Sequence, residues 1–94
     1  MKQQVEVIKR GKQHKSESYD RKKLFDSIVI TGLSLKLPSG QAEAIADKVC
    51  DSVELWLQNR PEVTSDDIRS RASIHLKTHH PDTAYLYEQY HITI

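Results

Sequence analysis

Three cationic side chains near the start of the chain, Lys9, Arg10 and Lys23, have the chemistry best suited to holding a ligand. Like charges that lie close together repel one another unless an anion neutralises them. Phosphate is a suitable anion, because arginine can donate to two of its oxygens at once and lysine supplies a point charge. These residue types therefore indicate a phosphate-binding site. Their spacing alone is also compatible with charged edge residues that keep a strand from pairing with other chains.

The charge distribution along the chain favours a local site over a uniformly basic surface. The 94 residues carry a net charge of +1, yet residues 1–24 hold eight Lys or Arg against three Asp or Glu. The remaining residues hold six against ten. The positive field is therefore confined to the first quarter of the chain.

Two short strands and the start of a helix are expected to position these cations. Val5 to Lys9 alternates and is rich in β-branched residues, and Gly11 is a natural turn residue. A second extended run ends at Tyr19, and Asp20 is a typical residue to cap a helix. We therefore expect a hairpin that carries two of the cations and leads directly into a helix that carries the third.

Two longer helices are expected next. The first begins after Asp20 and ends near Gly32, which we expect to form a left-handed cap. The second runs to about Asn59, and its apolar stripe consists of Ala42, Ile45, Ala46, Val49, Val53 and Trp56. Its opposite face is interpreted as solvated and carries Glu43, Asp47, Lys48, Asp51 and Glu54.

A capping sequence and a proline mark the remaining elements. Glu62–Thr64 is expected to be a short strand beside the hairpin, followed by a third helix over about residues 66–77. A fourth helix starts near Asp82, after Pro81, and its inward-facing residues are expected to be Ala84, Tyr85, Tyr87 and Tyr90. We therefore predict an α+β fold, a four-helix bundle covered by a small three-stranded sheet that begins with an N-terminal β-hairpin. Residues 1–94 are expected to form a single domain with its core at about 5–90.

The same motifs, in this order, resemble one known family. They comprise residues 7–11, Glu17, residues 19–24, residues 63–68, and Pro81 followed by residues 84–87. Together they resemble the ATP-cone domain, the nucleotide-sensing regulatory module of many ribonucleotide reductases and of a bacterial repressor of their genes. The resemblance runs from about Val5 to Tyr90. It departs from the family pattern at the hairpin turn, where Gly11 follows Arg10 directly and the aromatic residue comes about two positions late.

The resemblance implies a regulatory module and not an enzyme. It implies a site for ATP or dATP with Mg²⁺, in which Lys9, Arg10 and Lys23 hold the phosphates. The family's base-side contacts fall on positions that match Val7, Glu17, Asp20 and Thr64. Such a module, free-standing or excised from a ribonucleotide reductase, signals by changed self-association or by changed contact with the reductase.

The motifs that are missing from the sequence agree with a non-enzymatic role. No glycine-rich phosphate loop, nucleophile elbow or catalytic carboxylate pair is recognisable, and the His75 and His79 pair lacks a third metal ligand. One cysteine, no long apolar run and no signal-peptide pattern lead us to expect a cytoplasmic location. The alternative function from another class is a small nucleic-acid-binding or protein adaptor domain that uses the basic hairpin.

Overall fold

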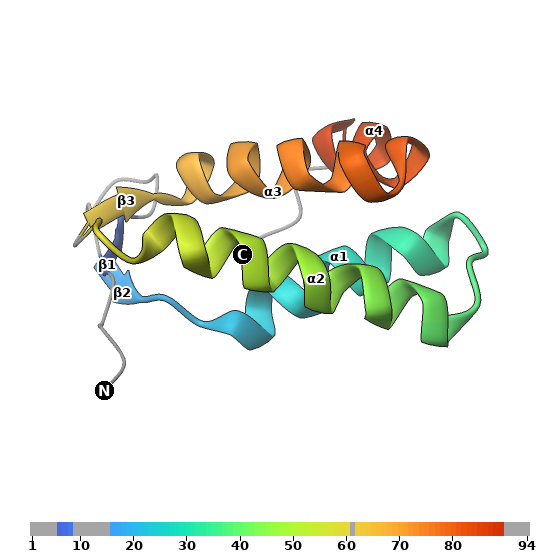
Figure 1. The fold of residues 1–94 in the computed structure, drawn as a ribbon, viewed down its shortest axis with the longest axis horizontal. Helices are drawn as coiled ribbons and strands as arrows, with labels where there is room; N and C mark the ends of the chain where they lie inside the picture. The colour runs from blue at the N-terminus through green and yellow to red at the C-terminus, as the bar shows by residue number, and fades with distance from the viewer. Residues whose placement is uncertain (1–5, 9–15, 61, 90–94) are drawn as a thin grey trace.

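Four helices account for most of the chain, and three very short strands meet at one end of them (Figure 1). The computed structural model describes residues 6–8, 16–60 and 62–89. In chain order the elements are β1 (Glu6–Ile8), β2 (Ser16–Ser18), α1 (Arg21–Ser34), α2 (Ser39–Leu57), β3 (Glu62–Thr64), α3 (Ser65–His79) and α4 (Pro81–Gln89). The number and order of the helices are as predicted, and so is the strand at residues 62–64.

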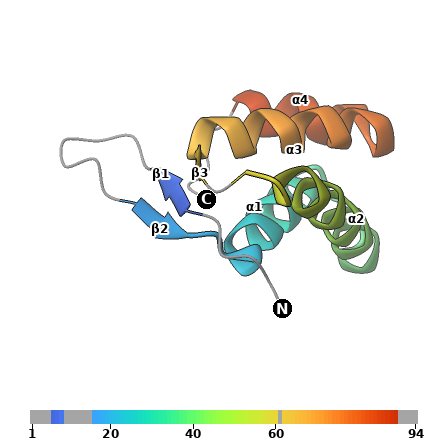
Figure 2. The same cartoon turned by 60° about the vertical axis from the view of Figure 1, so that its left-hand side comes forward.

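The predicted α+β fold, with a sheet covering the bundle, is wrong. Helices make up 79% of the residues whose side chains are described, and β3 is the one complete strand among them. In the backbone, β1 pairs antiparallel with β2 and parallel with β3, but each strand has three residues. A three-residue strand spans about 10 Å, whereas a 19-residue helix such as α2 spans about 28 Å. The strands therefore lie at the end of the helices and do not cover them (Figure 2).

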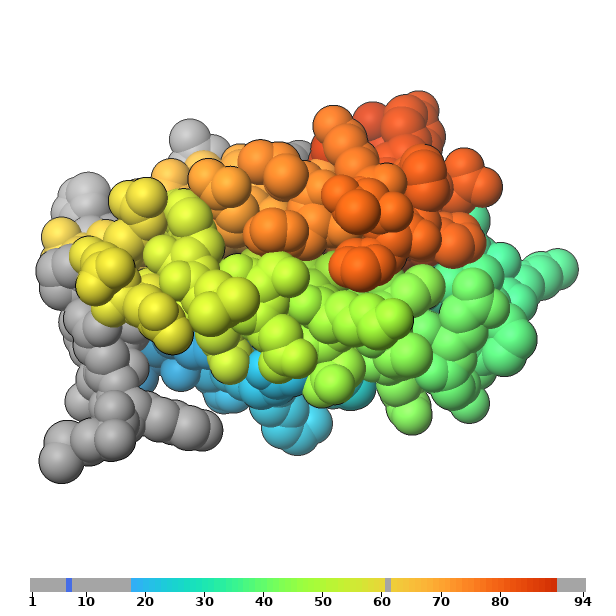
Figure 3. All heavy atoms as spheres, viewed as in Figure 1, coloured from blue at the N-terminus to red at the C-terminus, as the bar shows by residue number. Residues whose placement is uncertain are grey.

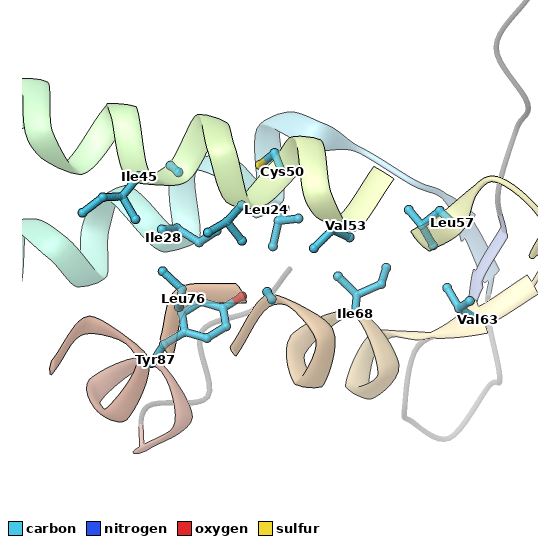
Figure 4. Close-up of a cluster of buried hydrophobic side chains, with 14 of the residues drawn as sticks. Leu24, Ile28, Ile45, Cys50, Val53, Leu57, Val63, Ile68, Leu76 and Tyr87 are labelled. Atoms are coloured by element: carbon cyan, nitrogen blue, oxygen red, sulfur yellow. The ribbon is translucent and has the colours of Figure 1, made fainter. Parts of the chain in front are cut away.

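The helices form two layers around one hydrophobic core. Helix α1 packs on α2, and α3 packs on both α4 and α2. Between the layers lies a continuous row of buried side chains (Figure 4), which includes Leu24, Ile28, Ile45, Val53, Ile68, Leu76 and Tyr87. At the strand end the row continues into Val63 of β3 and Val7 of β1. Burial of these apolar groups is the main force that holds the two layers together.

The start of α1 follows the prediction, but its end does not. Asp20 is the N-cap, and its Oδ1 accepts a hydrogen bond of 2.9 Å from the backbone N–H of Lys22. Gly32 is inside the helix, and the residue with positive φ is Lys36, at 64°. A Cβ on Gly32 would lie 3.1 Å from the Cβ of Ala42. The glycine therefore serves the close approach of α2, not a left-handed cap.

The inward face of α4 also differs from the prediction at one residue. Ala84 and Tyr87 are buried as expected, whereas Tyr85 is 66% exposed. The helix begins at Pro81, and the Nδ1 of His80 lies 3.2 Å from the backbone nitrogen of Thr83, from which it accepts a hydrogen bond. Tyr90 and the terminal residues after it lie outside the described residues. None of the described helices combines the length and the apolar character needed to cross a membrane.

Candidate functional site

The register of the strands determines which of the predicted ligand residues come together. Ile8 of β1 lies opposite Thr64 at the end of β3 and opposite Ser16 at the start of β2. Lys9 and Arg10 follow Ile8 directly in the sequence, although both lie outside the described residues. The candidate site is therefore the edge formed by Ile8, Ser16 and Thr64, where α3 begins.

Thr64 has a structural role at this edge. It is the N-cap of α3, and its Oγ1 accepts a 3.0 Å hydrogen bond from the backbone N–H of Asp67. In return the Asp67 carboxylate accepts a 3.0 Å hydrogen bond from the Thr64 N–H, which completes a capping box. The Thr64 hydroxyl still has its own hydrogen to donate. A ligand that accepts a hydrogen bond can thus be bound without loss of the cap.

Asp20 and Lys23 lie beyond the opposite end of the strands, away from Ile8 and Thr64. Because β2 runs antiparallel to β1, Ser18 pairs with Glu6, and the chain passes into α1 from there. Both residues are exposed, and Asp20 uses one carboxylate oxygen to cap the helix. The strand register thus pairs Thr64 with Ile8 and separates it from these two residues.

The two central positions of the strands differ in what they offer a ligand. Val7 lies between Glu17 of β2 and Val63 of β3, and its side chain is 5% exposed. Val7 is part of the hydrophobic core, so its side chain is turned away from any ligand on the outer surface. Glu17 is described in its backbone alone, opposite Val7.

An ion-pair network that the sequence analysis did not anticipate lies beside the start of α1. The guanidinium of Arg21 contacts three carboxylates of α2: Asp47 at 2.7 Å, Asp51 at 3.0 Å and Glu54 at 3.0 Å. Burial lowers the pKa of Arg21, but hydrogen bonds to these carboxylates outweigh it and the pKa is raised. We call these four residues the Arg21 cluster.

Tyr19 joins this cluster from the segment between β2 and α1. Its hydroxyl donates a 2.9 Å hydrogen bond to Glu54. Burial, together with this hydrogen bond and the negative charge of Glu54, raises the pKa of Tyr19. The Tyr19 hydroxyl therefore stays protonated and can donate. Cys50 is fully buried nearby, and burial raises its pKa to about 12, so its thiol is not a reactive group.

A signal for the Arg21 cluster is present in the sequence but ambiguous. Asp47, Asp51 and Glu54 recur at four- and three-residue spacing, which places them along one face of a helix. That pattern is equally typical of a solvated face, which was the interpretation above. The residue that distinguishes the two cases is Arg21, which precedes Asp47 by 26 residues in the sequence. Only the packing of α1 on α2 brings Arg21 to this face of α2.

The described residues contain no group of three or more His, Cys, Asp or Glu side chains arranged to hold a metal ion. His79 is exposed at the end of α3. Burial lowers the pKa of His75, and the nearby Arg71 and His79 lower it further.

Comparison of the chain with protein-family models, with curated proteins and with solved structures finds no match.

Proposed function

We propose that this chain is an ATP- or dATP-binding regulatory module that acts through changed association and not through catalysis. One observation carries the proposal. Thr64 lies opposite Ile8 in the parallel pair of β3 and β1, at a strand separation of about 5 Å. The predicted base-side contact at Thr64 is thereby next to the strand residue that precedes Lys9 and Arg10. Two segments that are 55 residues apart would contact one nucleotide.

The residues at this edge have the chemistry that such a ligand requires. Lys9 and Arg10 would bind the phosphates through charge-assisted hydrogen bonds. The Thr64 hydroxyl, which the capping box leaves free to donate, would bind an acceptor of the base or ribose. The N-terminus of α3, with its partial positive charge, begins at the next residue. Mg²⁺ would be held mainly by the phosphates, as is usual for this ion.

The proposed output is a change in self-association or in contact with a ribonucleotide reductase. Large apolar side chains are exposed on all four helices, among them Ile30 (54%) and Leu33 (45%) of α1 and Tyr85 (66%) of α4. Exposed apolar groups of this size favour association when several lie on one surface. The bound nucleotide would have to extend along the strands from Thr64 to reach Lys23, in the first turn of α1, and Lys23 would then link it to that helix. A cytoplasmic location fits this role and the buried, unpaired Cys50.

Thermal unfolding with added nucleotide tests the proposal, because a ligand that binds the folded chain and not the unfolded chain stabilises the fold. At a nucleotide concentration of a hundred times the dissociation constant, the stabilisation should be about 2.7 kcal/mol. ATP or dATP should raise the melting temperature more than GTP does. Equal melting temperatures with and without millimolar ATP and dATP would contradict nucleotide binding.

The output is tested separately by sedimentation of the chain without nucleotide, with ATP and with dATP. We expect the mass of the main species to differ between these conditions, and Lys23→Ala to reduce the difference. An unchanged mass in all of them, with and without a reductase, would exclude signalling through association.

The rival function, nucleic-acid or protein binding by the basic hairpin, is favoured by the charge balance of residues 1–24. It makes the opposite prediction for salt. Binding to a nucleic-acid backbone weakens steeply with added salt and depends on polymer length, whereas a nucleotide pocket distinguishes adenine from guanine at physiological salt.

A further inference from the structure

A single indole ring is in contact with two arginines at the border of α2 and α3. The guanidinium carbon of Arg60 lies 4.7 Å from the centroid of the Trp56 ring, and that of Arg71 lies 5.0 Å from it. Trp56 is in α2 and Arg71 is in α3, and these two helices lie side by side over one face of the molecule (Figure 3). Arg60 is in the segment that connects α2 to β3. The ring from α2 is thus in contact with two cations, one from the connecting segment and one from α3.

Neither of these guanidinium groups has a carboxylate partner among the described residues. This distinguishes them from Arg21, which contacts three carboxylates. Both cations lie within 5.0 Å of one ring centroid, so their charges are less than about 10 Å apart. The two positive charges therefore repel each other, and salt at 0.1 M screens this repulsion incompletely. Stacking on the ring offsets part of this repulsion. An anion that contacts both groups would remove it.

Two nitrogen atoms in the same region have unused hydrogen-bonding capacity. The Nε1 of Trp56 and the Nε2 of His75 are buried and have no hydrogen-bond partner in the described part of the chain. His75 is one helical turn after Arg71, close enough for the arginine charge to act on the imidazole. Buried polar atoms in proteins nearly always have partners, so these two are exceptional. One of them belongs to the stacked ring itself and the other to the residue one turn after Arg71.

We propose that Arg60 and Arg71, held against Trp56, form a binding site for a phosphate group. Each arginine presents a planar fork of donors that matches two phosphate oxygens, and stacking on the indole restricts its side chain in advance. None of the residues proposed to bind the nucleotide belongs to this site. The phosphate could belong to a free phosphate compound or to the backbone of a nucleic acid, since both present the same oxygens.

The site contains its own reporter, because Trp56 is the only tryptophan of the chain. Tryptophan emission should be followed during titration of the whole chain with pyrophosphate. We expect a saturable change in emission, and a dissociation constant at least about tenfold higher in Arg60→Gln and in Arg71→Gln. Arg69→Gln is the matched control, because Arg69 lies over a different ring, that of Tyr87 at 5.4 Å, and should bind pyrophosphate as the parent does. The double variant Lys9→Ala and Arg10→Ala should also keep the response, which separates this site from the proposed nucleotide site.

No saturable change in emission, or the same dissociation constant in the parent and in both glutamine variants, would overturn the proposal. Arg60→Lys covers the case in which a glutamine variant does not fold. It keeps the charge but lacks the fork, so it too should bind more weakly, and binding equal to that of the parent would overturn the two-fork geometry.

The source of the phosphate is identified by repeating the titration with single-stranded oligonucleotides. Binding that tightens with oligonucleotide length, weakens steeply with salt and requires both arginines assigns the site to a nucleic-acid backbone. Binding no tighter than that of pyrophosphate assigns it to free phosphate compounds.

Discussion

The hydroxyl of Tyr19 donates a hydrogen bond of 2.9 Å to the carboxylate of Glu54, which lies 35 residues later in the chain. Glu54 also contacts Arg21 at 3.0 Å. The segment that leaves β2 and enters α1 is thus attached to α2 by one neutral and one charged side chain. If a change in the hairpin moved the start of α1, either these contacts would break or α2 would move together with α1.

Loss of the Arg21 side chain should destabilise the fold more than loss of an ordinary surface cation. Arg21→Gln removes three partners of up to ~1 kcal/mol each, so we expect a decrease of about 1–2 kcal/mol in the free energy of unfolding, measured with urea. Lys22→Gln is the matched control, because it removes one exposed pair with Asp26 and should lower the free energy of unfolding much less than Arg21→Gln does. Equal effects of the two variants would show that the cluster does not act as a network.

The two described glycines should respond in opposite directions to alanine. Gly40 is in the first turn of α2, and a Cβ there would meet no atom within 4 Å, so Gly40→Ala should stabilise the fold by about 0.5–1 kcal/mol. Gly32→Ala should destabilise it, because the new Cβ would lie 3.1 Å from the Ala42 Cβ, which cannot rotate away. Thermal unfolding of both variants measures the difference. A stabilised Gly32→Ala would mean that α1 and α2 can separate at no cost.

The free energy of unfolding should fall as the pH decreases below the ordinary pKa of histidine. Burial, together with Arg71 and His79, lowers the pKa of His75 in the folded chain. Below about pH 6.5 the unfolded chain therefore binds a proton at this position that the folded chain does not, so stability rises with pH across that window. His75→Gln should flatten the dependence between about pH 5 and 6.5, measured by urea unfolding. An unchanged slope would assign the dependence to other groups.

Features set by neighbouring residues were predictable from the sequence. The Asp20 cap and the Thr64 and Asp67 capping box depend on side chains within three residues of the backbone groups they bind. The apolar stripe of α2 likewise follows the helical repeat, and most of it is buried. Local chemistry therefore sufficed for the helices and their starts.

Features set by distant packing were not predictable. The role of Gly32 depends on Ala42 of another helix, and the interpretation of Asp47 and Asp51 depends on where Arg21 comes to lie. The predicted covering sheet is absent because strands of three residues are too short to cover helices of up to 19 residues. Tyr85 was assigned inward by its neighbours Ala84 and Tyr87, but a helix with its neighbours on one side buries only part of its circumference.

Calorimetry with ATP, dATP and GTP is the most direct test of the central claim that Lys9, Arg10 and Thr64 bind an adenine nucleotide. We expect ATP or dATP to bind more tightly than GTP, and replacement of Lys9 or of Arg10 by Ala to weaken binding by about 1.5–3 kcal/mol. Replacing Lys12 and Lys15 together by Ala changes the charge of the same region without removing a predicted contact, so it should have a much smaller effect. If the Lys9 and Arg10 variants bound ATP and dATP as tightly as the parent does, or if the chain showed no preference for adenine, the claim would be contradicted.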